Sequence, residues 1–254
     1  MDYGLIGEKL GHSYSKEIHE ELASYTYDLC PLSKDEFPAF MEKRDFKAIN
    51  VTIPYKKMVI PYLKKLDDGA ASIGAVNTIV NRNGDLYGYN TDYLGFLYMC
   101  RKHDIDMQGK DVLVLGNGGA AQAVKAAVRS LKAGSLTVVD VVDDGESITY
   151  DEAYRGHADV DIIINTSPVG MYPDIDASPI DLSGFKKAEA VLDVIYNPLS
   201  TKLVLQARDL KKLGVTGLEM LIAQAKYAVE IFIDTAIDDT RIDEIYQRMC
   251  RDLQ

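Results

Sequence analysis

Three short polar stretches within the first hundred residues carry side chains that can hold and protonate a small polar molecule. The first is His12-Ser13-Tyr14-Ser15, which precedes an apolar helix pattern. One serine there would serve as a helix N-cap, whereas two hydroxyls can cap the helix and also donate to an anionic group such as a carboxylate. The pattern therefore predicts an anion-binding start to this helix.

The second stretch, Asn50 to Lys56, delivers a lysine directly after a strand. Strand alternation puts Asn50 and Thr52 on one face, and Pro54 suits the first turn of a following helix. The dipole of that helix would oppose a cation at Lys56, so the lysine would hold its proton less tightly. Such a place favours proton transfer over a surface role.

The third stretch joins Asn77-Thr78 to Asn90-Thr91-Asp92 through a hairpin, for which Asn83-Gly84 is a strong signal. Taken singly, each polar group in the three stretches fits an ordinary cap or turn residue. Their joint occurrence indicates one ligand site.

The elements that must position these groups alternate along the chain. Apolar runs predict strands at 3–6, 25–29, 48–53, 78–80 and 86–89, with helices at 15–24, 34–43 and from Asp92 onward. Beyond residue 105, strands are predicted at 112–116, 135–140, 159–165 and 190–196, and the last helices at 218–234 and 241–253. Repeated strand–helix alternation predicts an α/β fold with a doubly wound, parallel second sheet.

A glycine turn opens this second part. Gly116, Gly118 and Ala121 fit G-x-G-x-x-[G/A] directly after a strand and before an alanine-rich helix, and Asp140 follows Gly118 by 22 residues at the end of the next strand. Such a turn lets the backbone approach a pyrophosphate, and an acid at that distance binds ribose hydroxyls. The alternative is a tight turn that binds nothing.

Composition excludes several classes of protein. The formal net charge of -11 argues against a nucleic-acid partner, since phosphate backbones require clustered Lys and Arg. The three cysteines (Cys30, Cys100 and Cys250) form neither a disulfide framework nor a zinc motif, and no metal is expected. With no signal peptide or membrane-spanning run, we expect a cytoplasmic protein acting on a small molecule. Monomer and homodimer both stay open.

The motifs resemble those of the shikimate dehydrogenase family over nearly the whole chain. HSYS with His19 resembles H-S-x-S-P-x-x-H, NVTIPYK resembles N-V-T-x-P-[FY]-K, IGAVNT resembles [AI]-G-A-V-N-T, GYNTD resembles G-x-N-T-D, LGNGGAA resembles G-A-G-G-A, and EMLIAQA resembles G-M-L-x-x-Q-A. NTSPVGM (165–171) and DVIYNP (193–198) also look like family segments. Lys16 and Glu17 depart from the pattern, because they stand where the family has a proline.

The resemblance implies an NADP-linked oxidoreduction between 3-dehydroshikimate and shikimate, in the pathway of aromatic amino acid biosynthesis. It implies a substrate-binding domain at 1–104, joined by the C-terminal helices (about 219–254), and a Rossmann-type dinucleotide-binding domain at 105–218. Lys56 and Asp92 would be the proton-transferring pair. Ser13 and Ser15 would hold the carboxylate, and the remaining substrate ligands would be Asn50, Thr52, Asn77, Tyr196 and Gln224. The cofactor would lie on Gly116, Asn117, Gly118, Gly119, Ala120, Ala121, Asp140, Thr166, Val194 and Gly217.

The resemblance fails where the second strand of the cofactor domain ends. The family continues there with Asn-Arg-Thr, whose side chains clasp the adenosine 2′-phosphate, whereas this chain reads Val139-Asp140-Val141-Val142 and has no Arg or Lys before Arg155. The segment up to residue 160 is also too short for the family's usual helix. A carboxylate repels a phosphate and accepts ribose hydroxyls, so we predict NAD in preference to NADP, with Asp140 as the ribose ligand. Asp143, Asp144 and Glu146 are expected to form a solvated loop.

Two alternatives stay open. The first alternative is a quinate or quinate/shikimate dehydrogenase. Such enzymes often have threonine in place of the second serine, so Ser15 favours shikimate as the substrate. A ligand-binding relative with a degraded cofactor site is the other, and the retained Lys56 and Asp92 count against it because binding alone needs no proton-transferring pair.

Overall fold

The computed structural model describes residues 1–11, 13–142 and 145–252, and these divide into two compact units. Unit 1 comprises Met1–Gly95 and Ile222–Ile245, and unit 2 comprises Phe96–Leu221 and the segment from Tyr246 onward. The sequence predicts a boundary near residue 105 and assigns all of 219–254 to the first unit. The observed divisions differ because they fall inside the helices at 91–102, 218–233 and 240–252. The apolar periodicity of a helix predicts that one face is buried, but it does not indicate which unit buries that face.

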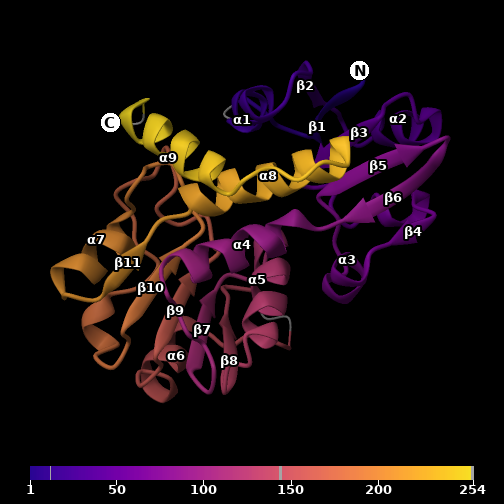
Figure 1. Cartoon of the computed structure of the whole chain (residues 1–254). Coiled ribbons are helices and arrows are strands. Elements are labelled where there is room, and N and C mark those ends of the chain that lie inside the picture. The colour runs from indigo at the N-terminus through magenta and orange to yellow at the C-terminus, as the bar shows by residue number, and fades with distance from the viewer. Residues whose placement is uncertain (12, 143–144, 253–254) are drawn as a thin grey trace. The chain divides into compact units, whose positions relative to one another are not determined.

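Unit 1 is built on a six-stranded mixed sheet with strand order β2-β1-β3-β5-β6-β4 (Figure 1). Its elements are β1 (Tyr3–Gly7), α1 (Ser15–Leu22), β2 (Tyr27–Pro31), α2 (Phe37–Lys43), β3 (Ala48–Val51), η1 (Ile60–Tyr62), β4 (Lys65–Leu66), α3 (Asp68–Ile73), β5 (Thr78–Arg82), β6 (Asp85–Tyr89) and the start of α4 (Thr91–Lys102). Strands β1, β2 and β3 run parallel, and β5 lies antiparallel to both β3 and β6. The strands predicted in this part are confirmed.

Both faces of this sheet are buried, which explains why its strands read as continuous apolar runs. Leu5 packs in a cluster with Tyr27 and Phe232, whereas its neighbour Ile6 packs in a different cluster with Phe37. Successive side chains of a strand point to opposite faces, so these two clusters lie on the two sides of the sheet. The hairpin forms as predicted, with Asn83 and Gly84 both at positive φ.

The helix predicted after Pro54 is absent, and that prediction was wrong. Residues 53–59 form a run of turns that leads only into the short 3₁₀ helix η1. The Tyr55 main-chain N–H donates to the Thr52 carbonyl at 2.9 Å, so Pro54 lies inside a four-residue turn. Lys56 therefore lies in a turn, and the helix-dipole argument for its proton affinity does not apply.

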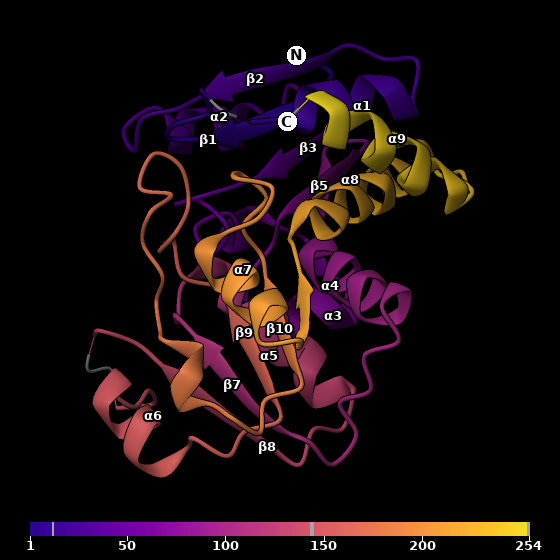
Figure 2. The ribbon, with the colours of Figure 1, turned by 90° about the vertical axis from the view of Figure 1, so that its left-hand side faces the viewer.

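Unit 2 is built on a five-stranded parallel sheet with order β11-β10-β9-β7-β8 (Figure 1), and Figure 2 shows β7, β8, β9 and β10 after a 90° turn. Its elements are β7 (Asp111–Leu115), α5 (Gly119–Ser130), β8 (Ser135–Val139), α6 (Tyr150–Gly156), β9 (Ile162–Asn165), η2 (Leu182–Gly184), β10 (Ala190–Asp193), α7 (Lys202–Asp209) and β11 (Leu213–Val215). The connections β7-α5-β8 and β10-α7-β11 proceed toward opposite edges of the sheet. Right-handed crossovers then put α5 and α7 on opposite faces, which confirms the doubly wound α/β class.

The sheet of unit 2 reverses its winding between β7 and β9, because the chain passes from β7 outward to β8 and then returns to β9. Ligands of open α/β sheets bind outside the carboxyl ends of the strands at such a switch point. The predicted glycine turn directly follows β7. Among the described residues between β8 and β9, the one helix is the 7-residue α6, in keeping with the short length of this segment.

The C-terminal helices are α8 (Leu218–Ile233) and α9 (Thr240–Asp252). Across the residues that the structure describes, none of the helices has the length and apolar character that crossing a membrane requires.

Candidate functional site

Two of the three polar stretches, Asn50 to Lys56 and Asn77-Thr78 with Asn90-Thr91-Asp92, meet at one edge of the sheet of unit 1. Asn50, near the end of β3, is the register partner of Thr78 at the start of β5, and Thr78 in turn faces Tyr89 at the end of β6. The turn that carries Lys56 leaves β3 at this edge, and α4 begins at Thr91, just beyond β6. Antiparallel pairing thus gathers three segments that lie far apart in the sequence.

Lys56 and Asp92 form an ion pair in this edge. Their Nζ and Oδ2 atoms are 2.5 Å apart, and the two side chains are 16% and 14% exposed. Asp92 lies in the first turn of α4, where the helix N-terminus favours a carboxylate. A cation held against a carboxylate, both partly shielded from water, can give a proton to a ligand oxygen or accept one from it.

Asn77, Thr78 and Thr91 form a buried hydrogen-bond network next to Asp92 in the chain. The Asn77 Oδ1 atom accepts the main-chain N–H of Thr91 at 2.7 Å and the Thr78 hydroxyl at 2.9 Å. The Asn77 Nδ2 atom donates to the Thr91 hydroxyl at 3.0 Å. An N–H can only donate, so the bond from the main chain of Thr91 decides which way the Asn77 amide points.

Asn50 is a buried member of the same network rather than an exposed ligand. Its Nδ2 atom donates to the Asn77 carbonyl at 3.1 Å and to the Thr78 hydroxyl at 3.0 Å, and its Oδ1 atom accepts the Tyr27 hydroxyl at 2.7 Å. Burial raises the pKa of Tyr27 well above its usual range, which keeps this hydroxyl a donor. Both N–H groups of Asn50 are thus engaged within the protein, although the sequence predicts a substrate contact.

The serine stretch leads into α1. Ser13 accepts the main-chain N–H of Ser15 on its Oγ at 3.3 Å, and Ser15 is the first residue of the helix. Both serines are partly exposed, so the hydroxyl groups can also meet a ligand. His12 lies outside the described residues.

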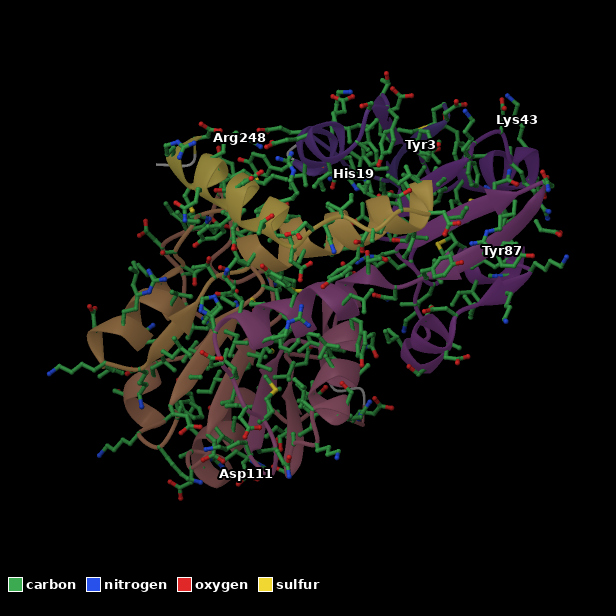
Figure 3. The ribbon with its side chains drawn as sticks, in the orientation of Figure 1. Tyr3, His19, Lys43, Tyr87, Asp111 and Arg248 are labelled. Carbon is green, nitrogen blue, oxygen red and sulfur yellow. The ribbon has the colours of Figure 1, made fainter. Side chains whose placement is uncertain are left out.

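His19, the other histidine of this region, is buried one turn further along α1, and Figure 3 labels it. Its ring stacks on Tyr27 at 4.1 Å between centroids, and its Nδ1 atom is 2.8 Å from the Tyr25 hydroxyl. Burial lowers the pKa of His19 to about 3, so the imidazole is neutral at physiological pH. It stabilises the helix that carries the serines.

The other predicted substrate ligands lie in two places. Thr52 follows β3 and is partly buried, with its main-chain N–H on the Ile6 carbonyl at 2.9 Å. Gln224 lies on α8, where its Oε1 atom is 3.5 Å from the Thr91 hydroxyl. These two belong to unit 1, whereas Tyr196 lies just after β10 in unit 2 and is partly buried.

The glycine turn of unit 2 packs closely at Gly116 and leaves the main chain open at Gly118 and Gly119. Gly116 has φ +92°, and a Cβ atom there would lie 2.9 Å from the Ser167 nitrogen, so only glycine fits. Gly118 caps the N-terminus of α5, and a Cβ atom at Gly118 or Gly119 would meet nothing within 4 Å. The main chain there is open to a ligand, and the first N–H groups of α5 can bind an anion. Ala120 and Ala121 belong to this first turn.

Asp140 lies at the end of β8, directly beside this turn. Its Oδ2 atom accepts the Asn117 main-chain N–H at 2.6 Å, and its Oδ1 atom accepts those of Val141 at 2.6 Å and Val142 at 3.2 Å. These three hydrogen bonds fix the carboxylate beside the turn. Glu146 is exposed, and the predicted loop residues Asp143 and Asp144 lie outside the described residues.

The remaining predicted cofactor residues support the turn through the main chain. The Thr166 hydroxyl donates to the Leu115 and Gly116 carbonyls at 2.9 Å and 3.0 Å. A Cβ atom at Gly217 would lie 2.2 Å from the Val194 carbonyl oxygen, so close backbone packing explains that glycine. These contacts fix the carboxyl ends of the strands, where a dinucleotide would bind.

Comparison with known proteins decides the family. A model described as the shikimate dehydrogenase substrate binding domain matches residues 5–79. A shikimate dehydrogenase (NADP(+)) of Clostridium beijerinckii is 37% identical, with 96% of this chain and 96% of that protein covered. The chain belongs to the shikimate dehydrogenase family.

Solved structures agree with this membership of the shikimate dehydrogenase family. A chorismate mutase/shikimate 5-dehydrogenase fusion protein from Clostridium acetobutylicum has a TM-score of 0.93 and 35% identity, with 99% of this chain and 97% of that chain covered. Shikimate 5-dehydrogenase from Listeria monocytogenes, solved in complex with shikimate and NAD, has a TM-score of 0.83 and 25% identity, with 97% and 96% covered. This member of the family is thus an oxidoreductase acting on CH–OH groups with a nicotinamide cofactor.

The sequence does not reveal two buried residues that support the site, Tyr27 and Lys125. Tyr27 and Thr91 orient the amides of Asn50 and Asn77, and Lys125 contacts Asn117 in the glycine turn. Tyr27 and Lys125 occupy positions that read as ordinary strand and helix residues. Thr91, by contrast, already belongs to the predicted Asn90-Thr91-Asp92 stretch.

Proposed function

We propose that the protein catalyses reversible hydride transfer between 3-dehydroshikimate and shikimate, with unit 1 binding the substrate and unit 2 the dinucleotide. The observation that carries this proposal is the Lys56–Asp92 pair, held within 2.5 Å at an edge lined by hydroxyl and amide groups. A protein that only bound its ligand would have no use for a proton-transferring pair. Family membership supplies the reaction, and the pair supplies the acid–base group that the reaction requires.

Lys56 and Asp92 perform the proton transfer at the reacting oxygen. When bound, the nicotinamide supplies or takes up the hydride. In the direction of reduction, Lys56 donates a proton from Nζ to the carbonyl oxygen, and in the direction of oxidation it takes that proton back from the hydroxyl. Asp92 accepts a hydrogen bond from the ammonium and fixes its position, so the proton moves along a defined line.

The other polar groups of unit 1 fix the ring. Ser13 and Ser15 donate to the substrate carboxylate, and Thr52, Asn77, Asp92 and Gln224 contact ring hydroxyls, with Tyr196 of unit 2 as a further ligand. Asn50 acts indirectly, because its own hydrogen bonds hold Asn77 and Thr78 in place. All of these groups except Tyr196 belong to unit 1 of a single chain, so a monomer or a homodimer carries the complete acid–base pair.

For the cofactor we infer a preference for NAD. Two features support it: the carboxylate of Asp140, fixed beside the glycine turn by three main-chain N–H groups, and a sequence without Arg or Lys from Asp140 to Tyr154. The curated Clostridium relative is named for NADP(+), and the Listeria structure contains NAD, so family membership alone does not select the cofactor.

The size of the preference follows from Coulomb repulsion. Two unit charges 4 Å apart interact by about 4 kcal/mol at an effective dielectric of 20 and by about 1 kcal/mol in water. Asp140 is partly exposed, which puts the repulsion between these limits. We expect about 2 kcal/mol against a 2′-phosphate, or roughly 30-fold in relative kcat/KM.

Replacing the Asp140 carboxylate by an amide of the same shape tests the inferred preference for NAD. The variant Asp140→Asn should raise kcat/KM for NADP relative to NAD by roughly 30-fold. Glu146→Gln, which removes an exposed carboxylate further along the same loop, is the matched control and should leave the ratio within about twofold. An unchanged ratio in Asp140→Asn would remove Asp140 from cofactor selection. Calorimetry that detects shikimate but neither nucleotide would instead indicate a binding protein.

A further inference from the structure

Lys16 lies at the start of α1, where the serine stretch departs from the motif that it resembles. The motif has a proline directly after its second serine, and this chain has Lys16 after Ser15. A proline restrains the backbone at that point, because its ring holds φ at about −65°. A lysine imposes no such restraint. Other contacts must therefore hold the serine-bearing start of α1 in place.

The Lys16 side chain supplies such a contact, because it binds Tyr27, the first residue of β2. Its Nζ atom donates to the Tyr27 carbonyl at 2.8 Å. The Glu20 Oε1 atom accepts the Tyr27 main-chain N–H at 2.9 Å and lies 2.5 Å from Lys16 Nζ. β2 is an edge strand, where main-chain groups lack a strand partner on one side. We call the contacts of Lys16 and Glu20 with the main chain of Tyr27 the Tyr27 clamp.

The same face of α1 also contacts the Tyr27 ring. His19 lies on one face of the helix with Lys16 and Glu20, since residues three and four apart are neighbours. Its ring stacks on that of Tyr27 at 4.1 Å between centroids. The helix that begins at Ser15 thus holds both the main chain and the side chain of Tyr27.

The Tyr27 hydroxyl extends these contacts into the polar edge of unit 1. It donates to Asn50 Oδ1 at 2.7 Å. Asn50 Nδ2 in turn donates to the Asn77 carbonyl at 3.1 Å and to the Thr78 hydroxyl at 3.0 Å. A continuous series of contacts therefore joins α1 to the hydrogen-bond network that precedes Asp92.

We propose that Lys16 and Glu20 are positioning residues for the substrate and that they act through Tyr27. A shikimate molecule whose carboxylate meets the two serines and whose ring hydroxyl meets Asn77 spans both ends of this series. Its affinity then depends on the distance between the two ends, which the Tyr27 clamp fixes. Lys16 and Glu20 themselves do not touch the substrate. This inference rests on the proposed binding of shikimate to unit 1 and assigns what holds the parts of that site in register.

Steady-state kinetics with shikimate as the varied substrate test the proposal. Lys16→Met removes the ammonium and keeps the length of the side chain, which is 44% exposed and so can be replaced without loss of the fold. It should raise KM for shikimate by about fivefold, the equivalent of one hydrogen bond, with little change in kcat or in KM for NAD. Glu20→Met should raise KM for shikimate in the same direction. Lys16→Arg keeps a cationic donor and should stay close to the unmodified protein.

A double-variant cycle shows whether Lys16 acts through Tyr27. Tyr27→Phe removes the hydroxyl that reaches Asn50. If Lys16 acts through that hydroxyl, Lys16→Met combined with Tyr27→Phe has a KM no higher than that of Tyr27→Phe alone. Lys64→Met is the matched control, because it removes an ion pair of the same length elsewhere in unit 1, and it should leave KM unaltered.

Three results would overturn the inference. An unchanged KM in Lys16→Met, whatever happens to kcat, would mean that the Tyr27 clamp only supports the fold. Additive rises in the double variant would separate Lys16 from Tyr27. A higher KM in Lys16→Met together with a lower KM in Glu20→Met would assign the ammonium to direct contact with the substrate carboxylate. Failure of the unmodified protein to turn over shikimate with either cofactor would instead contradict the proposed function itself.

Discussion

Acid should destabilise unit 1 through His19, the buried histidine of α1. The residue is 1% exposed, its ring stacks on Tyr27, and its Nδ1 atom contacts the Tyr25 hydroxyl. Within the described residues, Nε2 has no hydrogen-bond partner. A proton added there would bury a charge with nothing to offset it. The helix that would be disturbed is the one that begins at Ser15.

The magnitude follows from the difference in proton affinity between the folded and unfolded chain. Burial lowers the pKa of His19 from 6.5 to about 3. The unfolded chain therefore binds the proton more tightly, so the stability contributed by the neutral ring is complete above pH 6.5 and is lost as the pH falls toward 3. At about 1.4 kcal/mol per pH unit, the loss is roughly 2 kcal/mol by pH 5 and roughly 5 kcal/mol in full.

The assay compares the protein with His19→Asn, whose side chain keeps a hydrogen-bonding atom near the position of Nδ1 and does not titrate in this range. Urea unfolding at about pH 6.5 and about pH 5, followed by hydrogen exchange of the α1 and β1 amides, gives the free energy of unfolding of unit 1. The advantage of the unmodified protein over the variant should shrink by roughly 2 kcal/mol on acidification. Other titrating groups cancel in this difference. His157→Asn, in unit 2, serves as the control.

A stability difference that stays constant between the two pH values would refute the reasoning. It would mean that water reaches the His19 ring, or that the ring accepts a proton without cost. A shift of equal size in His157→Asn would show that the effect is not specific to the buried ring.

Three further predictions concern the site and its supports. Lys56→Ala should lower kcat by about 100-fold or more with little change in unfolding, while Lys57→Ala, an exposed neighbour, should leave kcat unaltered. Burial raises the pKa of Asp193 to about 6, so the folded state holds its proton more tightly. Unit 2 should lose about 2 kcal/mol of stability as the pH rises from 4 to above 6, and Asp193→Asn should abolish that slope in urea unfolding. Tyr27→Phe removes the donor to Asn50 and should cost about 1 kcal/mol of stability and raise KM for shikimate more than it changes kcat.

The sequence predicts the parts of the fold that local chemistry decides. Asn83 and Gly84 tolerate positive φ, so the hairpin between β5 and β6 is readable from two residues. The apolar run before Gly116 and the alanine-rich stretch after it likewise predict β7 and α5. In unit 1, the alternation of side chains along β3, β5 and β6 predicts the polar residues at the ends of these strands.

Other features depend on partners that lie far along the chain. A proline after a strand is compatible with both a helix start and a turn, so the sequence around Pro54 could not exclude the helix that the structure lacks. Asn50 resembles a ligand until Tyr27, 23 residues away, is seen to occupy its oxygen. Lys125 reads as one more residue of a helix, because nothing local indicates that its ammonium reaches Asn117.

We propose that the Lys56–Asp92 pair takes up the hydroxyl proton while the nicotinamide accepts the hydride from shikimate, and that Asp140 directs this reaction toward NAD. Steady-state kinetics that cross shikimate and quinate with NAD and NADP test it most directly. We predict the highest kcat/KM for shikimate with NAD, with quinate and NADP each reducing it. A clear preference for NADP would contradict the role of Asp140, and a preference for quinate, or no turnover with any of the four pairs, would contradict the proposed reaction.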